Sequence, residues 1–172
     1  WRLSMQVNNQ LIHRPKFVWI ASLITLAVVI GAGLRQIVLH QRQAEVAMRG
    51  AQVMPFDLEK TTHHFEPLSD GGLQTVVADA PVDPKQVNLI QSHLEEETAK
   101  FQAGDFSDPA AIHGDAMPGL KQLRAGYRDM TVEYTALPDG GQIRYTAQQS
   151  NLVTAVHDWF AAQRSDHGHH AE

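Results

Sequence analysis

Two stretches of the chain repeat one order of hydrophobic and polar positions. Phe65–Gly72 parallels Tyr134–Gly141 at an offset of 69 residues, and both copies end in Asp-Gly-Gly. This tripeptide between alternating runs is typical of a tight hairpin, because glycine reaches positive φ without steric cost. At the same offset Val76 corresponds to Tyr145. The pattern predicts two copies of a β-hairpin.

A helix is expected after each hairpin. Asp83 is a suitable N-cap, Pro84 suits the first helical position, and Gln86 lies three residues after the cap. An apolar stripe at helical spacing follows, made of Val87, Ile90, Leu94, Thr98 and Phe101. A second helix is predicted to begin after Ser150. Its apolar face holds Leu152, Val153, Val156, Trp159 and Phe160.

These elements predict an α+β domain over residues 56–166. Two hairpin–helix repeats would form about four antiparallel strands with both helices packed on one face. Residues 104–128 separate the copies and are rich in Gly and Pro. Loops on a rigid scaffold often carry binding groups, so this segment is a candidate location for a site.

The N-terminal part has a different pattern. Phe17–Leu34 is an uncharged run, and residues 17–39 predict a single transmembrane helix. The alternative is a cleaved signal peptide, because Gly31-Ala32-Gly33 is a suitable cleavage site. Small residues at Ala27, Gly31 and Gly33 would let another helix approach closely.

Charge divides along the same line. The net charge is −5, yet residues 1–40 contain four basic and no acidic residues. This asymmetry predicts a cytoplasmic tail at 1–16 and an acidic domain on the periplasmic side of a bacterial inner membrane. Residues 40–55 would be a connector and residues 167–172 a His-rich tail. The expected partners are the lipid bilayer and other transmembrane subunits.

Composition excludes several function classes. The chain has no Cys, which rules out disulfide scaffolds, thiol catalysts and iron–sulfur centres. Phosphate-loop, GxSxG, HExxH and GxGxxG motifs are also missing. The acidic domain argues against nucleic-acid binding. The sequence therefore predicts a protein that is not an enzyme.

The ten histidines provide the candidate chemistry. His93 and Glu97 lie one turn apart on the first helix, as a metal-ligand pair or as a hydrogen-bonded pair at the helix edge. His113 and Met117 combine an imidazole with a thioether, a set that suits copper or haem iron, although Met117 equally suits a core position. His157 flanks the stripe of the second helix and would approach His93 if the halves are related by a twofold axis.

Several phrases together carry a family resemblance. They are His93-Leu94 with Phe101, Gly104–Pro109, Ile112–Gly114, Met117–Leu120, His157–Gln163 and Ser165–Gly168. Over residues 60–168 the chain resembles a poorly characterised group of exported bacterial proteins that are often labelled aspartate carbamoyltransferase. That label does not fit, because the chain lacks the Ser-Thr-Arg-Thr phosphate-binding motif of true carbamoyltransferases. It is also too short for the two domains of those enzymes. The resemblance implies export and one compact domain.

Two functions are consistent with these patterns. The first is a non-enzymatic, membrane-anchored accessory subunit of a larger electron-transfer or photosynthetic complex. The alternative is a periplasmic protein that binds copper or zinc, and less favourably haem. Its ligands would come from five residues: His93, Glu97, His113, Met117 and His157.

Overall fold

The computed structural model describes residues 15–80 and 82–171, without the side chains of residues 15–24, 27 and 169. The chain divides into two units, residues 1–40 and residues 41–172. The described strands all belong to the second unit. Helix α1 (Pro15–Val53) passes through the boundary between the units.

The membrane prediction needs correction. A bilayer span needs about 20 predominantly apolar residues. The apolar part of α1 with described side chains begins at Thr25 and meets Arg35. Within the described part of the chain, no helix is long and apolar enough to cross a membrane. This finding overturns the prediction of a single-pass inner-membrane protein with a periplasmic domain. Residues 1–14 of the predicted tail, and the side chains of 17–24 in the predicted span, lie outside the described residues.

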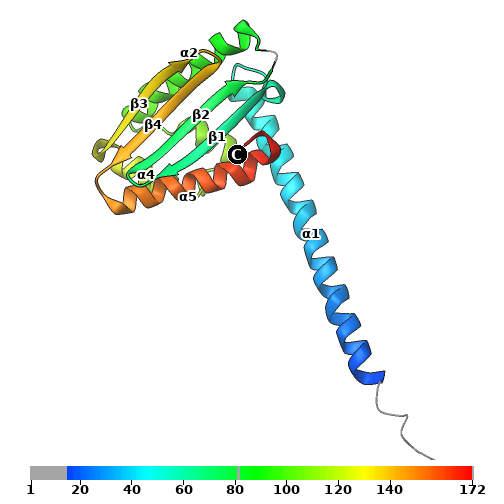
Figure 1. Ribbon diagram of the computed structural model, residues 1–172. Coiled ribbons are helices and arrows are strands. Elements are labelled where there is room, and N and C mark those ends of the chain that lie inside the picture. The colour runs from blue at the N-terminus through cyan, green and yellow to red at the C-terminus, as the bar shows by residue number, and fades with distance from the viewer. Residues whose placement is uncertain (1–14, 81, 172) are drawn as a thin grey trace, which may run out of the picture. The chain divides into compact units, whose positions relative to one another are not determined.

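The second unit is built on one antiparallel sheet with the strand order β1-β2-β4-β3 (Figure 1). Its strands are β1 (Thr61–Leu68), β2 (Gly71–Ala78), β3 (Met130–Leu137) and β4 (Gly140–Ala147). The predicted α+β class and the four antiparallel strands are confirmed. Each hairpin is closed by a two-residue turn, as the Asp-Gly-Gly pattern indicates.

The two hairpins are related by an approximate twofold axis between β2 and β4. The backbone N–H of Ala147 donates to the carbonyl of Asp70 at 2.9 Å, and that of Ala78 donates to the carbonyl of Asp139 at 2.8 Å. Each donor and each acceptor maps onto its counterpart at the same 69-residue offset that the sequence repeat shows. The internal repeat is therefore a structural repeat.

The glycines that follow the turns are required mainly by close backbone contact. A Cβ on Gly71 would come within 2.0 Å of the carbonyl oxygen of Tyr145, and one on Gly140 within 2.0 Å of that of Val76. Gly71 also has a φ of 149°, whereas the φ of Gly140 is not positive. Positive φ therefore explains only the first of the two glycines.

Helices α2 (Pro84–Gln102) and α5 (Ser150–His167) cover one face of the sheet (Figure 1). The carboxylate of Asp83 accepts a hydrogen bond from the N–H of Lys85 at 2.9 Å, which confirms the predicted cap. Helix α2 packs on β3 and β4, and α5 packs on β1 and β2. Each helix thus packs on the hairpin of the other half, which ties the repeats together.

Short elements occupy the segment between the repeats and the ends of the unit. They are α3 (Ser107–His113), α4 (Leu120–Gly126) and three 3₁₀ turns at Leu58–Lys60, Tyr127–Asp129 and Gly168–His170. The irregular segment that the sequence places at 104–128 therefore contains two one- to two-turn helices. They lie near α2 and α5 and help to close the core.

The predicted connector and tail both belong to the packed unit. Val46, in the expected connector 40–55, is 1% exposed and lies in the core with Met54 and Phe56. In the expected tail 167–172, Ala171 forms a β-bridge with His63. The physical reason is apolar burial and backbone pairing, which the polar composition of these two segments conceals.

Candidate functional site

A cavity of about 50 Å³ lies against the helix-covered face of the sheet. Its lining comes from β1, β2, β4, α2, α3, α5 and residues 53–56. Apolar side chains such as Leu94, Phe101 and Ile143 form part of the wall. The polar lining residues are His63, Gln74, His93, Glu97, Asp108, His113, Gln163 and His167.

Three of the five predicted ligand residues lie at this cavity. His93 and Glu97 reach it from α2, and His113 reaches it from the end of α3. Glu97 is 6% exposed and His113 is 5% exposed. The tertiary structure thus gathers residues that are separated by one helix and a loop in the sequence.

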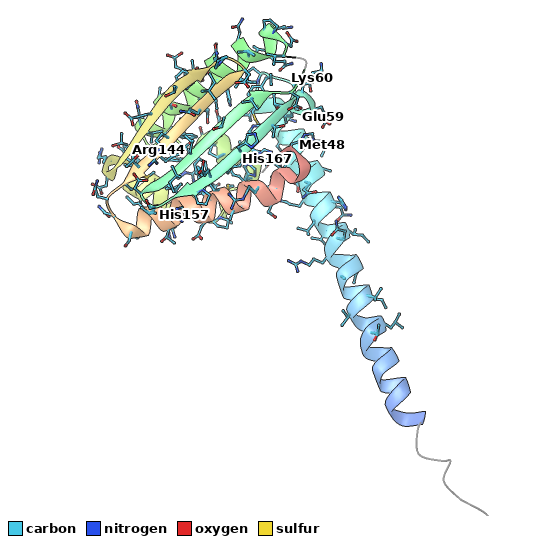
Figure 2. All side chains as sticks on the ribbon, viewed as in Figure 1. Met48, Glu59, Lys60, Arg144, His157 and His167 are labelled. Atoms are coloured by element: carbon cyan, nitrogen blue, oxygen red, sulfur yellow. The ribbon has the colours of Figure 1, made fainter. Side chains whose placement is uncertain are left out.

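The other two predicted residues have structural contacts elsewhere. Met117 is 6% exposed and belongs to the hydrophobic core. The Nε2 of His157 lies 2.9 Å from the carbonyl oxygens of both Leu68 and Gly71, at the turn between β1 and β2. His157 and His93 are therefore not brought together. Figure 2 shows His157 well separated along α5 from His167, which does line the cavity.

Three buried nitrogen atoms from cavity-lining residues have no hydrogen-bond partner. They are Nδ1 of His63, Nε1 of Trp159 and Nε2 of Gln163, in residues that are 3%, 1% and 6% exposed. The Trp and Gln nitrogens are donors only. A buried donor without an acceptor costs about 1–3 kcal/mol, so native proteins rarely leave one unpaired. Three unpartnered nitrogens in residues of one cavity indicate a binding site for a group that carries hydrogen-bond acceptors.

Imidazoles cluster beside these atoms. The ring centroids of His63 and His167 are 5.1 Å apart with nearly parallel planes, and those of His113 and His167 are 5.1 Å apart edge-to-face. Burial and the neighbouring imidazoles lower the pKa of His63 to about 4 and the pKa of His167 well below its ordinary value. Both rings are therefore neutral near pH 7, and each can accept a proton.

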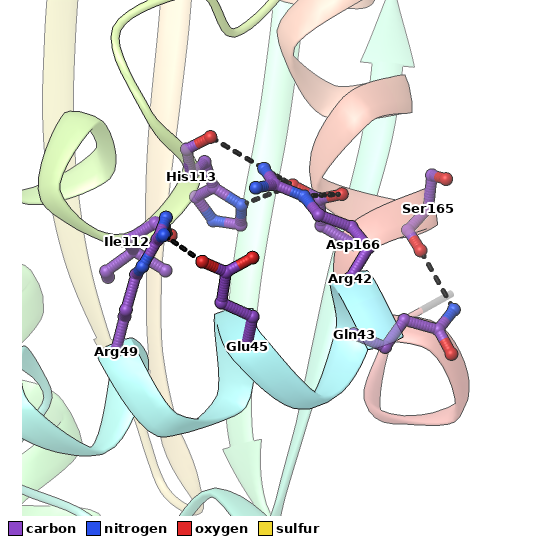
Figure 3. Close-up of polar contacts among 8 residues, drawn as sticks. All are labelled: Arg42, Gln43, Glu45, Arg49, Ile112, His113, Ser165 and Asp166. Atoms are coloured by element: carbon purple, nitrogen blue, oxygen red, sulfur yellow. Dashed lines mark hydrogen bonds and ion pairs between the residues drawn. The ribbon is translucent and has the colours of Figure 1, made fainter. Parts of the chain in front are cut away.

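His113 is held by a carboxylate (Figure 3). Its Nδ1 lies 2.8 Å from Asp166, and Arg42 contacts both oxygens of the same carboxylate at 2.7 and 3.1 Å. Burial raises the pKa of Asp166, but hydrogen bonds from His113 and Arg42 outweigh it and hold the pKa at about 2. Arg42 also donates to the His113 carbonyl at 2.6 Å. These contacts fix the orientation of the imidazole ring.

A second charged group lies on the α2 side. Burial, and then the nearby Asp108, raise the pKa of Glu97 to about 8. Lys100 contacts Glu97 at 3.1 Å and Asp108 at 2.7 Å. Burial lowers the pKa of His93. Near neutral pH, this wall therefore contains a protonated Glu97 and an Asp108–Lys100 ion pair.

Sequence reasoning missed several lining residues. It placed His63 facing the core, treated Trp159 as part of an apolar stripe and assigned His167 to the His-rich tail, but it gave Gln163 no role in a site. Trp159, Gln163 and His167 are spaced four residues apart on α5, so they share one helix face. That spacing is a signal that could have identified them.

Metal and haem binding find limited support in the geometry. Across residues 15–80 and 82–171, no set of three or more His, Asp or Glu side chains is arranged to hold a metal ion. A cavity of about 50 Å³ has room for roughly four water-sized groups, far fewer than a porphyrin needs. Copper or zinc binding through the predicted residues stays a prediction.

Comparisons with known proteins add no identification. No family model matches the sequence, and no significant match emerges among curated proteins or solved structures. The resemblance to the exported bacterial group stays a prediction. Any functional inference therefore depends on the structure itself.

Proposed function

We propose that residues 41–171 form a binding domain for a small polar ligand, which occupies the cavity beside α5. The observation that carries this proposal is the set of three buried, unpartnered nitrogens in His63, Trp159 and Gln163, three residues that line one cavity. A ligand oxygen would satisfy them, and the apolar wall would shield those hydrogen bonds from water.

Binding is favoured over catalysis by the residue types present. The described lining contains no Ser, Thr, Cys or Lys that could act as a covalent nucleophile. Asp166 holds His113 in one orientation, and an imidazole fixed in this way suits recognition of a ligand. The proposal therefore keeps the expectation of a non-enzymatic protein and replaces the five-residue metal site by an organic or oxyanion site.

The test uses the full chain and a panel of small probes. Formate, acetate, nitrate, acetamide, urea, Cu(II) and Zn(II) are titrated against it while the thermal unfolding midpoint is followed. At least one non-metal probe should raise the midpoint, because a ligand that binds only the native state stabilises it.

The matched variants are Gln163→Leu at the cavity and Gln148→Leu at an exposed position. Gln163→Leu should abolish the shift, and Gln148→Leu should keep it. Stabilisation by Cu(II) or Zn(II) alone, with loss in His93→Ala and His113→Ala, would favour the metal alternative and overturn the proposal.

The accessory-subunit role is a second candidate, favoured by the first unit. Leu26, Val28, Val29, Ile30, Leu34, Ile37 and Val38 are all more than half exposed. A Cβ at Gly31 or Gly33 would meet no atom within 4 Å, so this helix face is uncovered in the described structure. Exposed apolar surface of this kind marks an interaction site. Cross-linking from Val29→Cys in whole cells, with Gln52→Cys as the control, would reveal a partner subunit.

A further inference from the structure

We propose that the ligand of this cavity is a small oxyanion of the carboxylate type, and that it binds together with one proton, which His63 holds. The inference rests on the proposed function and specifies its ligand class.

The unpartnered atoms define the ligand's polar groups. Nε1 of Trp159 and Nε2 of Gln163 can only donate, so they require acceptor oxygens. Nδ1 of His63 donates when its ring carries hydrogen there. Unpartnered nitrogens in three residues of one cavity match the lone pairs of a carboxylate, whereas a cation or an ammonium group would meet the Trp159 and Gln163 donors.

The cavity size limits the ligand. About 50 Å³ has room for roughly four water-sized groups. Acetate and formate are of this scale, and longer acids would exceed it. Apolar neighbours such as Leu94 and Ile143 suit a methyl or hydrogen substituent.

The charges around the cavity explain the proton. Among the described residues, no Lys or Arg lines the cavity, and a bare anion buried without a cation is costly. The neighbouring charges are already paired, since Asp166 contacts Arg42 and Asp108 contacts Lys100. An entering anion would therefore draw a proton onto an adjacent neutral imidazole.

His63 is the best placed proton acceptor. It combines an unpartnered Nδ1 with a stacked neighbour, His167, and in the free protein its pKa is about 4. A bound anion would raise this pKa. The titratable and charged groups around it come from every neighbouring element: Arg42, His64, His93, Glu97, Lys100, Asp108, His113, Asp166, His167 and His170.

The linkage has a definite sign. The bound state holds one more proton than the free state, so affinity for the anion falls as pH rises. As long as His63 stays protonated in the bound state, the fall between pH 6 and 8 approaches tenfold per pH unit, because His63 is neutral in the free protein throughout this range.

The experiment is calorimetric titration of the full chain with sodium acetate at pH 6, 7 and 8. Repeating it in Tris and in HEPES, which differ in ionisation enthalpy, counts the protons taken up. We expect about one proton per acetate. Acetamide, which has the same shape and no charge, should bind with little dependence on pH between pH 6 and 7, where Glu97 stays protonated.

Three variants separate the roles. Gln163→Glu replaces the donor amide by a carboxyl group of the same shape and should abolish acetate binding, while Gln148→Glu should not. His63→Gln keeps a donor but cannot take the proton, so affinity should fall and lose its pH dependence. His64→Gln, on the other face of β1, should retain both the affinity and its pH dependence. Far-UV circular dichroism checks that each variant is folded.

The outcomes distinguish the two levels of the argument. Acetate binding without proton uptake, or with unchanged pH dependence in His63→Gln, would overturn the coupled-proton inference. Binding of acetamide or urea that depends on Gln163, with no binding of acetate, formate or nitrate, would overturn the oxyanion class and leave the proposed function standing. No Gln163-dependent binding of any probe would overturn both.

Discussion

The layer between the sheet and its helices has two ends that are both largely buried but chemically different. One end, here called the aromatic end, is formed by Phe101, Phe106, Tyr145 and Phe160. The other, the cavity end, is formed by His63, Gln163, His167 and His113. Phe101 and Trp159 belong to both ends, since both residues line the cavity and the ring of Trp159 packs edge-on against Phe101 and Tyr145.

The difference lies in how polar groups are satisfied. At the aromatic end, the buried hydroxyl of Tyr145 donates to Oε1 of Gln74 at 2.9 Å. At the cavity end, the nitrogens of His63 and Gln163 have no partner. Buried polar groups are normally paired because desolvation without a partner is costly. The aromatic end therefore stabilises the fold, and the cavity end retains unpaired polar groups suited to binding.

The largest effect is expected from Phe160→Ala at the aromatic end. Phe160 is fully buried and its ring contacts Phe65, Tyr145 and Trp159. Loss of the ring leaves a cavity and should lower the free energy of unfolding by about 3–5 kcal/mol. Urea denaturation measures this change, and a loss below about 1 kcal/mol would contradict the assignment of stability to this end.

An intermediate effect is expected at the cavity end in acid. The pKa of His63 in the folded protein is about 4, against an ordinary value of 6.5. As pH falls from 6.5 to 4, the unfolded chain takes up a proton that folded His63 resists, so stability falls across this window. Above pH 6.5 this contribution is fully present.

The variant His63→Gln should therefore lose less stability than the wild type over that window. The difference is on the order of 3 kcal/mol, from a shift of this size at about 1.4 kcal/mol per pKa unit. Urea denaturation at pH 4, 5.5 and 7 gives the slopes, with His64→Gln as the control. Equal slopes for wild type and His63→Gln would show that His63 is not the buried neutral group described.

The smallest effect tests the pairing difference directly. Tyr145→Phe removes a satisfied hydrogen bond and leaves Gln74 Oε1 unpaired, so it should cost about 1–2 kcal/mol of unfolding free energy. Gln163→Leu removes an unpartnered donor and should change stability by less than about 0.5 kcal/mol, or raise it. A larger loss in Gln163→Leu than in Tyr145→Phe, measured without ligand, would erase the proposed distinction between the two ends.

Much of the fold was predictable because its signals are local. The cap at Asp83, the stripe from Val87 to Phe101 and the two Asp-Gly-Gly turns depend on neighbours within a few residues. The 69-residue repeat also predicted that the two hairpins form one antiparallel sheet. The predicted membrane span was wrong, because an apolar composition alone does not give a helix an apolar stretch long enough to cross a bilayer.

The site was only partly predictable from the sequence. His93, Glu97 and His113 were selected by residue type, whereas Met117 and His157 were selected by the same rule and lie elsewhere. Residue type does not distinguish an imidazole that caps a turn, such as His157, from one that lines a cavity, such as His113. Only the direction of each side chain in the folded unit separates these cases.

The sequence by itself therefore determined the hairpins, the helix caps, the apolar stripes and the repeat, because each follows from backbone preferences and short-range periodicity. The tertiary structure alone decided that His63 from the first strand, His113 from the middle segment and Gln163 from the last helix line one cavity. Those contacts join residues far apart in the chain. They depend on packing between layers, which no local pattern encodes.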